Sequence, residues 1–187
     1  MLKIVGYILL SLGTGLFSSM EFSEDVVIEG ASAKEARIAF LNMDLIVEAH
    51  PLLRSWRLVS SEHRDGSTCS HIELVDQIMG FNVIYQAEML FDPLDPTGNI
   101  QFDSEAALSI KVSHTYSFRD AVPGGAQPSS APTPAAAAII SDRVSVRYSL
   151  FSFPLKMFVD GTVRDATRKV LDNMRSIIQQ RIPGSRA

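Results

Sequence analysis

The sequence predicts an α+β fold in which a curved antiparallel sheet of about seven strands wraps around one long C-terminal helix. Residues 54–152 alternate between apolar and polar side chains almost throughout, which is typical of strands with one buried face. Residues 155–182 instead repeat apolar side chains at helical spacing along one stripe. The stripe consists of Phe158, Val159, Val163, Ala166, Val170, Leu171, Met174, Ile177 and Ile178. A sheet closed by a single helix favours holding an apolar molecule.

Composition limits the classes of function. The 187 residues suit one domain with a substantial core. The net charge is −4 and no basic run occurs, so we expect no nucleic-acid partner. Cys69 is the only cysteine, so neither an intramolecular disulfide nor a thiolate metal cluster can form. We interpret Cys69 as an ordinary strand residue.

The N-terminal segment, residues 1–20, is hydrophobic and precedes the predicted domain at residues 21–183. Its uncharged stretch, residues 4–17, is shorter than the roughly twenty residues of a membrane span, but it has the length of a signal-peptide core. The residues before Ser18 and Ser19 fit a cleavage site less well. A signal, an anchor that contacts a membrane, and a packed tail all stay open. The protein is secreted or membrane-associated in the first two cases and cytoplasmic otherwise.

The domain begins with a strand and two short helices. Residues 22–29 alternate and predict the strand. Residues 32–35 have the spacing of a capping box and predict a helix that runs to about Met43. Asp44 can cap a second short helix, which has to end near Pro51 because the residue before a proline avoids helical geometry.

Further strands follow, separated by turn residues such as Asp65-Gly66 and Asp95-Pro96. We expect these strands at residues 54–62, 68–78, 81–91, 99–104, 108–119 and 141–150. Residues 121–138 are rich in Pro, Ala, Gly and Ser, a composition that buries too little apolar surface to order itself. We predict a disordered hairpin loop inserted in the domain, since strands of the same type continue after it.

Three stretches resemble the helix-grip fold of the START-like, or SRPBCC, superfamily, which includes polyketide cyclases, aromatases, pollen-allergen-type proteins and lipid-transfer domains. The stretches are FSEDVVIEGASAKEARIAFLNM, EAHPLLRSWRLV and VRYSLFSFPLKMFVDGTVRDATRKVLDNMRSII. The resemblance covers about residues 22–182. It implies that the long helix lies across the concave face of the sheet and leaves a hydrophobic cavity.

Strand and helix faces that point into this cavity supply the candidate ligand-binding residues. They are Tyr85, Met89, His114, Tyr116, Tyr148, Phe158, Val163 and Met174. The polar tips of His114, Tyr116 and Tyr148 can anchor a carbonyl or hydroxyl of an otherwise apolar ligand. Core residues whose polar tips find partners within the protein would look the same in sequence.

Other polar residues give weaker signals. Asp76 shares an alternating face with Leu74 and could act as a general base, but its place near a strand end favours exposure. Trp56 is interpreted as a core residue. His50, His63 and His71 lack the close spacing of metal ligands, so we expect no metal and no cofactor. No nucleophile, phosphate-loop or dinucleotide motif occurs, so we name no catalytic residue.

We therefore expect a non-enzymatic binder or carrier of a hydrophobic small molecule such as a lipid, a sterol or a polyketide-like compound. A polyketide cyclase or aromatase that uses the same cavity is the alternative, and it requires His114, Tyr116 or Asp76 to converge there. A third possibility is a protein-interaction module whose cavity is filled by Met89, Phe158 and Met174.

Overall fold

The structure of the chain, a computed structural model, describes residues 19–78, 80–106, 109–121, 136–149 and 152–181. The strands are β1 Ser19–Glu29, β2 Leu53–Arg64, β3 Ser67–Ile78, β4 Phe81–Phe91, β5 Ile100–Ala106, β6 Ile110–Asp120 and β7 Ala137–Arg147. The helices are α2 Ala33–Leu41, α3 Met43–Ala49 and α4 Lys156–Arg181, the last preceded by a 3₁₀ turn, η2, at Phe153–Leu155.

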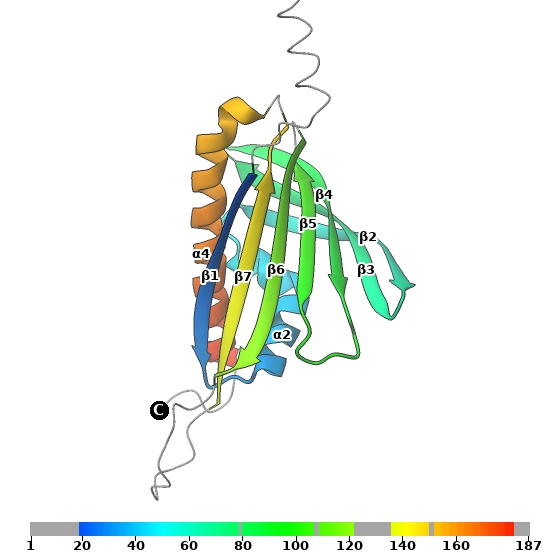
Figure 1. The fold of residues 1–187 in the computed structure, drawn as a ribbon, viewed down its shortest axis with the longest axis vertical. Helices are drawn as coiled ribbons and strands as arrows, with labels where there is room; N and C mark the ends of the chain where they lie inside the picture. The colour runs from blue at the N-terminus through cyan, green and yellow to red at the C-terminus, as the bar shows by residue number, and fades with distance from the viewer. Residues whose placement is uncertain (1–18, 79, 107–108, 122–135, 150–151, 182–187) are drawn as a thin grey trace, which may run out of the picture.

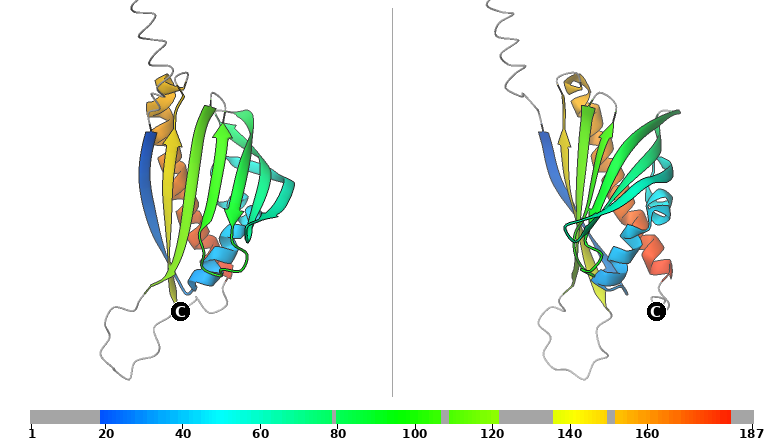
Figure 2. Two further views of the ribbon diagram at one scale, coloured as in Figure 1. Left: turned by 45° about the vertical axis from the view of Figure 1, so that its right-hand side comes forward. Right: turned by 90° about the vertical axis from the view of Figure 1, so that its right-hand side faces the viewer.

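The strands form one antiparallel sheet in the order β1-β7-β6-β5-β4-β3-β2 (Figure 1). The sheet curves, and α2, α3 and α4 lie on one of its faces (Figure 2). The long helix α4 contacts β1 and α3, while α2 contacts β6 and β7. The predicted seven-stranded sheet around a long C-terminal helix, with two short helices after the first strand, is confirmed.

Strand β7 is the element whose position differs most from the prediction, since it spans residues 137–147 and not 141–150. Its second residue, Ala138, is fully buried between Asp120 of β6 and Ile28 of β1. Small side chains fit this crowded position, so the last two residues of the predicted loop 121–138 belong to the sheet. Residues 122–135 lie outside the described residues, and a disordered loop there stays a prediction.

The N-terminal segment also lies outside the description up to residue 18, so its role as signal, anchor or tail stays open. The described helices include none that is both long and apolar enough to cross a bilayer.

The two short helices begin and end where local chemistry dictates. Ser32 caps α2 in a complete capping box, with the Glu35 amide donating to the Ser32 hydroxyl and the Ser32 amide to the Glu35 carboxylate. The cap of α3 is Asn42 and not Asp44 as predicted, because the Asn42 side chain accepts the Asp44 amide at 3.0 Å. The Asp44 carboxylate instead accepts the Trp56 indole N–H at 2.7 Å.

The hairpin between β2 and β3 turns at Asp65 and Gly66, whose φ angles are 52° and 82°. Two successive positive φ angles characterise the turn whose twist matches that of paired strands, and Asp-Gly is a preferred sequence for it. This local turn sets the register in which Arg64 faces Ser67.

The core lies between the concave face of the sheet and the helices. Ile28, Ile72, Leu74, Ile140 and Met174 are fully buried there. Each such side chain contributes roughly 1.5–3 kcal/mol through removal of apolar surface from water. This shared burial, more than helix propensity, holds α4 against the sheet.

Polar contacts also attach α4 to its neighbours. The Asn173 amide donates to the Ala49 carbonyl at 2.7 Å, where α3 ends. Arg168 pairs with Glu24 of β1 at 2.9 Å. The pair is exposed and contributes little to stability, but its geometry marks where α4 crosses the first strand.

Candidate functional site

A cavity of about 240 Å³ lies between the inner face of the sheet and α4. Strands β3 to β6 form one wall, and α2, α3 and α4 contribute to the other walls. The lining is mostly apolar and includes Leu74, Ile110, Val112, Val159, Ala166 and Val170. Sheet curvature separates the strands from the helix here, so their side chains do not meet across the gap.

Most of the predicted cavity residues line this space. They are Tyr85, Met89, His114, Tyr116, Phe158 and Val163. Phe158 is also 56% exposed, so the cavity reaches the surface beside the first turn of α4. Whether these residues contact a ligand stays a prediction.

Tyr148 is buried but does not line the cavity. It belongs to a smaller cluster with Ile110, Val144 and Val146, and its hydroxyl donates to Asp160 of α4. Burial, the hydrogen bond to Asp160 and its negative charge raise the pKa of Tyr148. The residue follows the end of β7, where α4 begins, so it joins helix to sheet.

Met174 also lies outside the cavity lining, in the main core with Leu171 and Ile178. The residues of α4 that line the cavity end at Val170. Beyond that point α4 packs on α3, which closes the gap, and Met174 is 0% exposed. The helical stripe is therefore divided between a cavity half and a core half.

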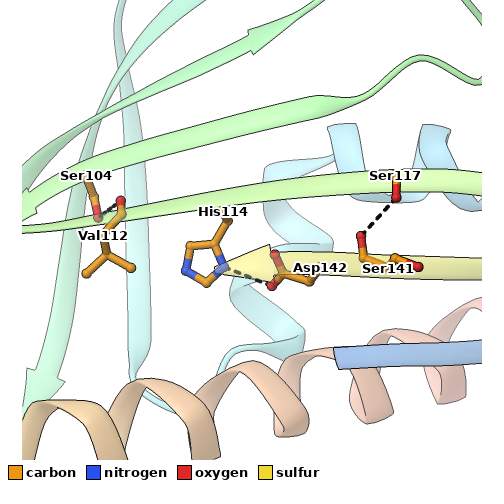
Figure 3. Close-up of polar contacts among 6 residues, drawn as sticks. All are labelled: Ser104, Val112, His114, Ser117, Ser141 and Asp142. Atoms are coloured by element: carbon orange, nitrogen blue, oxygen red, sulfur yellow. Dashed lines mark hydrogen bonds and ion pairs between the residues drawn. The ribbon is translucent and has the colours of Figure 1, made fainter. Parts of the chain in front are cut away.

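His114 forms a buried pair with Asp142, with 2.9 Å between Nδ1 and Oδ2 (Figure 3). The Asp142 side chain is only 1% exposed. Burial by itself lowers the pKa of His114, but the charge and hydrogen bond of Asp142 outweigh it, so the pKa of His114 is raised. The pair leaves Nε2 as the ring nitrogen available to a ligand.

Tyr116 lies beside this pair. Its ring stacks on that of His114 with centroids 5.8 Å apart, and Phe40 of α2 packs against it at 5.0 Å. Tyr116 is directly opposite Asp142 in the pairing of β6 with β7. Burial, followed by the charge of the Asp142 carboxylate and a hydrogen bond to it, raises the pKa of Tyr116, so its phenol stays protonated.

Asp142 was not among the residues predicted from the sequence. The residue alternates with Ile140, Val144 and Val146, all on the buried face of β7. A carboxylate in the middle of an apolar face was the signal that could have identified it, because such a group has to find a partner.

Asp76 is a correction to the sequence analysis, which favoured an exposed side chain. It is only 7% exposed and lines the cavity. Leu53 of β2 lies opposite Asp76 in the sheet and extends the cavity wall there. Asp76 is therefore covered although it lies near the end of β3. The Tyr85 hydroxyl donates to Asp76 Oδ2 at 3.1 Å. Burial raises the pKa of Asp76, although that hydrogen bond and the charge of Arg54 act in the opposite direction.

His50 is a further polar residue of the cavity wall that the sequence analysis did not select. Its Nδ1 accepts the backbone amides of Leu52 and Leu53 at 3.2 and 2.9 Å, just after α3 ends. Burial, followed by the positive charges of His114 and Arg54, lowers the pKa of His50 to about 4. His50 is therefore neutral near pH 7 and acts as a hydrogen-bond acceptor for the backbone.

The outer part of the β2–β3 hairpin brings together Glu62, Cys69 and His71, with their potential ligand atoms within 4.8 Å of one another. This proximity could not be predicted from the spacing of the residues, because Glu62 reaches Cys69 only through the pairing of β2 with β3. None of the three lines the cavity. Glu62 is exposed, and exposed acidic groups are common without any ion.

No model of a known protein family matches the chain, and no curated protein matches its sequence. Solved structures do resemble it. The Zhui aromatase/cyclase from Streptomyces sp. R1128 has a TM-score of 0.66 at 10% identity, covering 91% of this chain and 99% of that one. Ara h 8.0201 has a TM-score of 0.62 at 14% identity, covering 87% and 99%. A START superfamily protein from Mycobacterium smegmatis has a TM-score of 0.57 at 14% identity, covering 86% and 97%.

Proposed function

We propose that this chain, which has the START-like helix-grip fold, binds a hydrophobic small molecule in the cavity beneath α4. The observation that supports this proposal most directly is a mostly apolar cavity of about 240 Å³ that reaches the surface beside Phe158. Apolar ligand surface that enters such a space contributes roughly 25 cal/mol per Å² removed from water. The ligand class is a lipid, a sterol or a polyketide-like compound.

The polar residues of the wall support a ligand that carries a carbonyl or hydroxyl group. His114 offers Nε2 while Nδ1 stays bound to Asp142, and the Tyr116 phenol beside it stays protonated and offers its oxygen as an acceptor. A few placed polar groups on an apolar wall orient a ligand without supplying most of its affinity.

A protein-interaction module with a filled cavity has less support. That function requires Met89, Phe158 and Met174 to occupy the space. Phe158 is more than half exposed, and Met174 lies in the core outside the cavity lining.

The test is native mass spectrometry of the purified protein, with extraction of any bound molecule and titration with a panel of fatty acids, sterols and aromatic polyketides. Val163→Trp places an indole in the cavity and is expected to abolish the bound species. Arg175→Trp, on the exposed side of the same helix, is the matched control and should keep it. Both variants should melt within a few degrees of the wild type. Wild-type protein that binds no member of the panel and carries no extracted molecule contradicts the proposal.

An acid–base enzyme acting on the bound molecule is the second candidate, and the convergence of His114, Tyr116 and Asp142 favours it. A raised pKa makes neutral His114 a stronger base, which can remove a proton from the carbon beside a ligand carbonyl. The Tyr116 hydroxyl, once it turns from Asp142, can donate a hydrogen bond to the carbonyl oxygen as negative charge develops there. Proton removal of this kind is the first step of aldol-type ring closure.

We test this candidate with the bicyclic ketone 1-tetralone in deuterated buffer, following deuterium incorporation beside its carbonyl by NMR. A catalytic His114 is expected to accelerate exchange by about 10²-fold or more over buffer, and His114→Phe should abolish the acceleration. Asp142→Asn removes the charge that strengthens the base and should lower the rate while binding persists. If the ketone binds but its deuterium exchange is no faster than in buffer, the enzymatic candidate is contradicted and the binding function stands.

A further inference from the structure

Asp76 is a charged group in the cavity wall that neither proposed role uses. Asp76 points one carboxylate oxygen, Oδ2, at the Tyr85 hydroxyl, but its other oxygen, Oδ1, is buried without any hydrogen-bond partner among the described residues. The side chain is 7% exposed and lines the cavity. A carboxylate oxygen has acceptor capacity that water fills at the surface of a protein, so its burial without a partner is costly.

The neighbouring groups that the structure describes do not supply the missing partner. Tyr85 lies diagonally across from Asp76 in the pairing of β3 with β4, and its single hydroxyl proton already points to Oδ2. Arg54 acts on Asp76 through its charge, but its Nε donates to Gln77 at 3.1 Å. Within the described residues, no ion pair joins Arg54 to Asp76. No described residue therefore donates to Oδ1, and a bound molecule can supply the donor.

We propose that Asp76 forms a second polar subsite of the cavity, where Oδ1 accepts a hydrogen bond from a hydroxyl or amino group of the bound molecule. This inference rests on the proposed binding function and narrows its ligand class. The molecule is an apolar compound with a hydrogen-bond donor, such as an alcohol, a phenol or an amine. A fatty acid that presents its carboxylate to this subsite is disfavoured, because two negative charges would share one buried site.

Tyr85 has a positioning role in this subsite. The hydrogen bond to Oδ2 holds the carboxylate in one orientation, while burial and the Asp76 charge raise the pKa of Tyr85 and keep the phenol protonated. Oδ1 is thereby left for the ligand, and the donor meets an acceptor that is already oriented.

The test compares two ring probes, 2-naphthol and 2-methoxynaphthalene, by fluorescence titration at neutral pH. The probes share a ring system, but the ether has no donor. The measured quantity is the donor preference, which is the dissociation constant of the ether divided by that of the naphthol. Asp76→Leu should lower this preference by about 10- to 100-fold, since a hydrogen bond to a charged acceptor contributes roughly 1.5–3 kcal/mol.

Glu73→Leu is the matched control, because it removes a carboxylate from the same strand on the face away from the cavity, where Glu73 pairs with Arg57. It should leave the donor preference unchanged. Should Asp76→Leu fail to fold, Asp76→Asn keeps the size of the side chain and should lower the preference less, since a neutral amide is a weaker acceptor.

The possible results distinguish a failure of the Asp76 subsite from a failure of the proposed binding function. If both probes bind and the preference is the same in the wild type and the Asp76 variants, the subsite is wrong while the binding function stands. If the wild type binds neither probe, both the subsite and the binding of apolar rings are contradicted.

Discussion

Met174→Ala is expected to lower the free energy of unfolding by about 2–5 kcal/mol, the usual cost of truncating a large buried side chain and leaving a cavity. Met174 is 0% exposed and packs in the main core, where α4 lies against α3. Urea denaturation followed by circular dichroism measures the change. Because Met174 lies outside the cavity lining, ligand binding at low denaturant should persist, which separates a core role from the ligand-contacting role that the sequence suggested.

Met157→Ala is the matched control on the same helix. Met157 is 90% exposed, so its truncation should change stability by less than about 0.5 kcal/mol. Equal losses in the two variants would contradict the placement of α4. A Met174→Ala protein of wild-type stability would show that the C-terminal half of α4 does not pack in the core.

Lowering the pH from about 7 to about 4 is expected to remove about 3 kcal/mol of stability through His50 alone. Its pKa is 6.5 in an unfolded chain and about 4 in the folded protein. Between these values the unfolded state binds more protons than the folded state, so stability falls as the pH falls. A difference of one between the folded and unfolded pKa corresponds to about 1.4 kcal/mol of stability.

The comparison that isolates His50 is urea denaturation of the wild type and of His50→Asn across this pH range. Asparagine keeps an acceptor for the amides of Leu52 and Leu53 but does not titrate. The variant should therefore lose less stability than the wild type between pH 6.5 and 4. His114 acts outside this window, because its raised pKa makes a contribution that is present below pH 6.5 and is lost as the pH rises. Parallel pH profiles for the two proteins would show that His50 does not titrate in a buried site.

The elements of secondary structure could be predicted from the sequence because their signals are local. Alternation with period two marks a strand whichever strand it pairs with, and the stripe in residues 155–182 marks a helix that runs from 156 to 181 in the structure. The capping box at Ser32 and the Asp65-Gly66 turn involve neighbours within three residues. Their geometry needs no information from the rest of the chain.

The boundaries of the cavity were harder to predict from the sequence than the secondary structure. Alternation assigns a side chain to a face but not to a position along that face, and only part of the inner face borders the cavity. Tyr148 and Met174 share the predicted face and lie outside the cavity lining, while Asp76, expected at the surface, lies within it. Sheet curvature decides where α4 separates from the sheet and where it packs against α3. This curvature accumulates over the seven strands of the sheet.

The sequence by itself determined the strands, the long helix, the helix-grip resemblance and an apolar interior, because each follows from periodicity or from short-range hydrogen bonding. Only the tertiary structure decided which polar groups meet. Asp142 lies beside His114 because β7 pairs with β6 across a separation of 28 residues, and Tyr85 reaches Asp76 through the register of β3 with β4. A pairing register is a property of two strands together, so a partner set by register cannot be read from either strand alone.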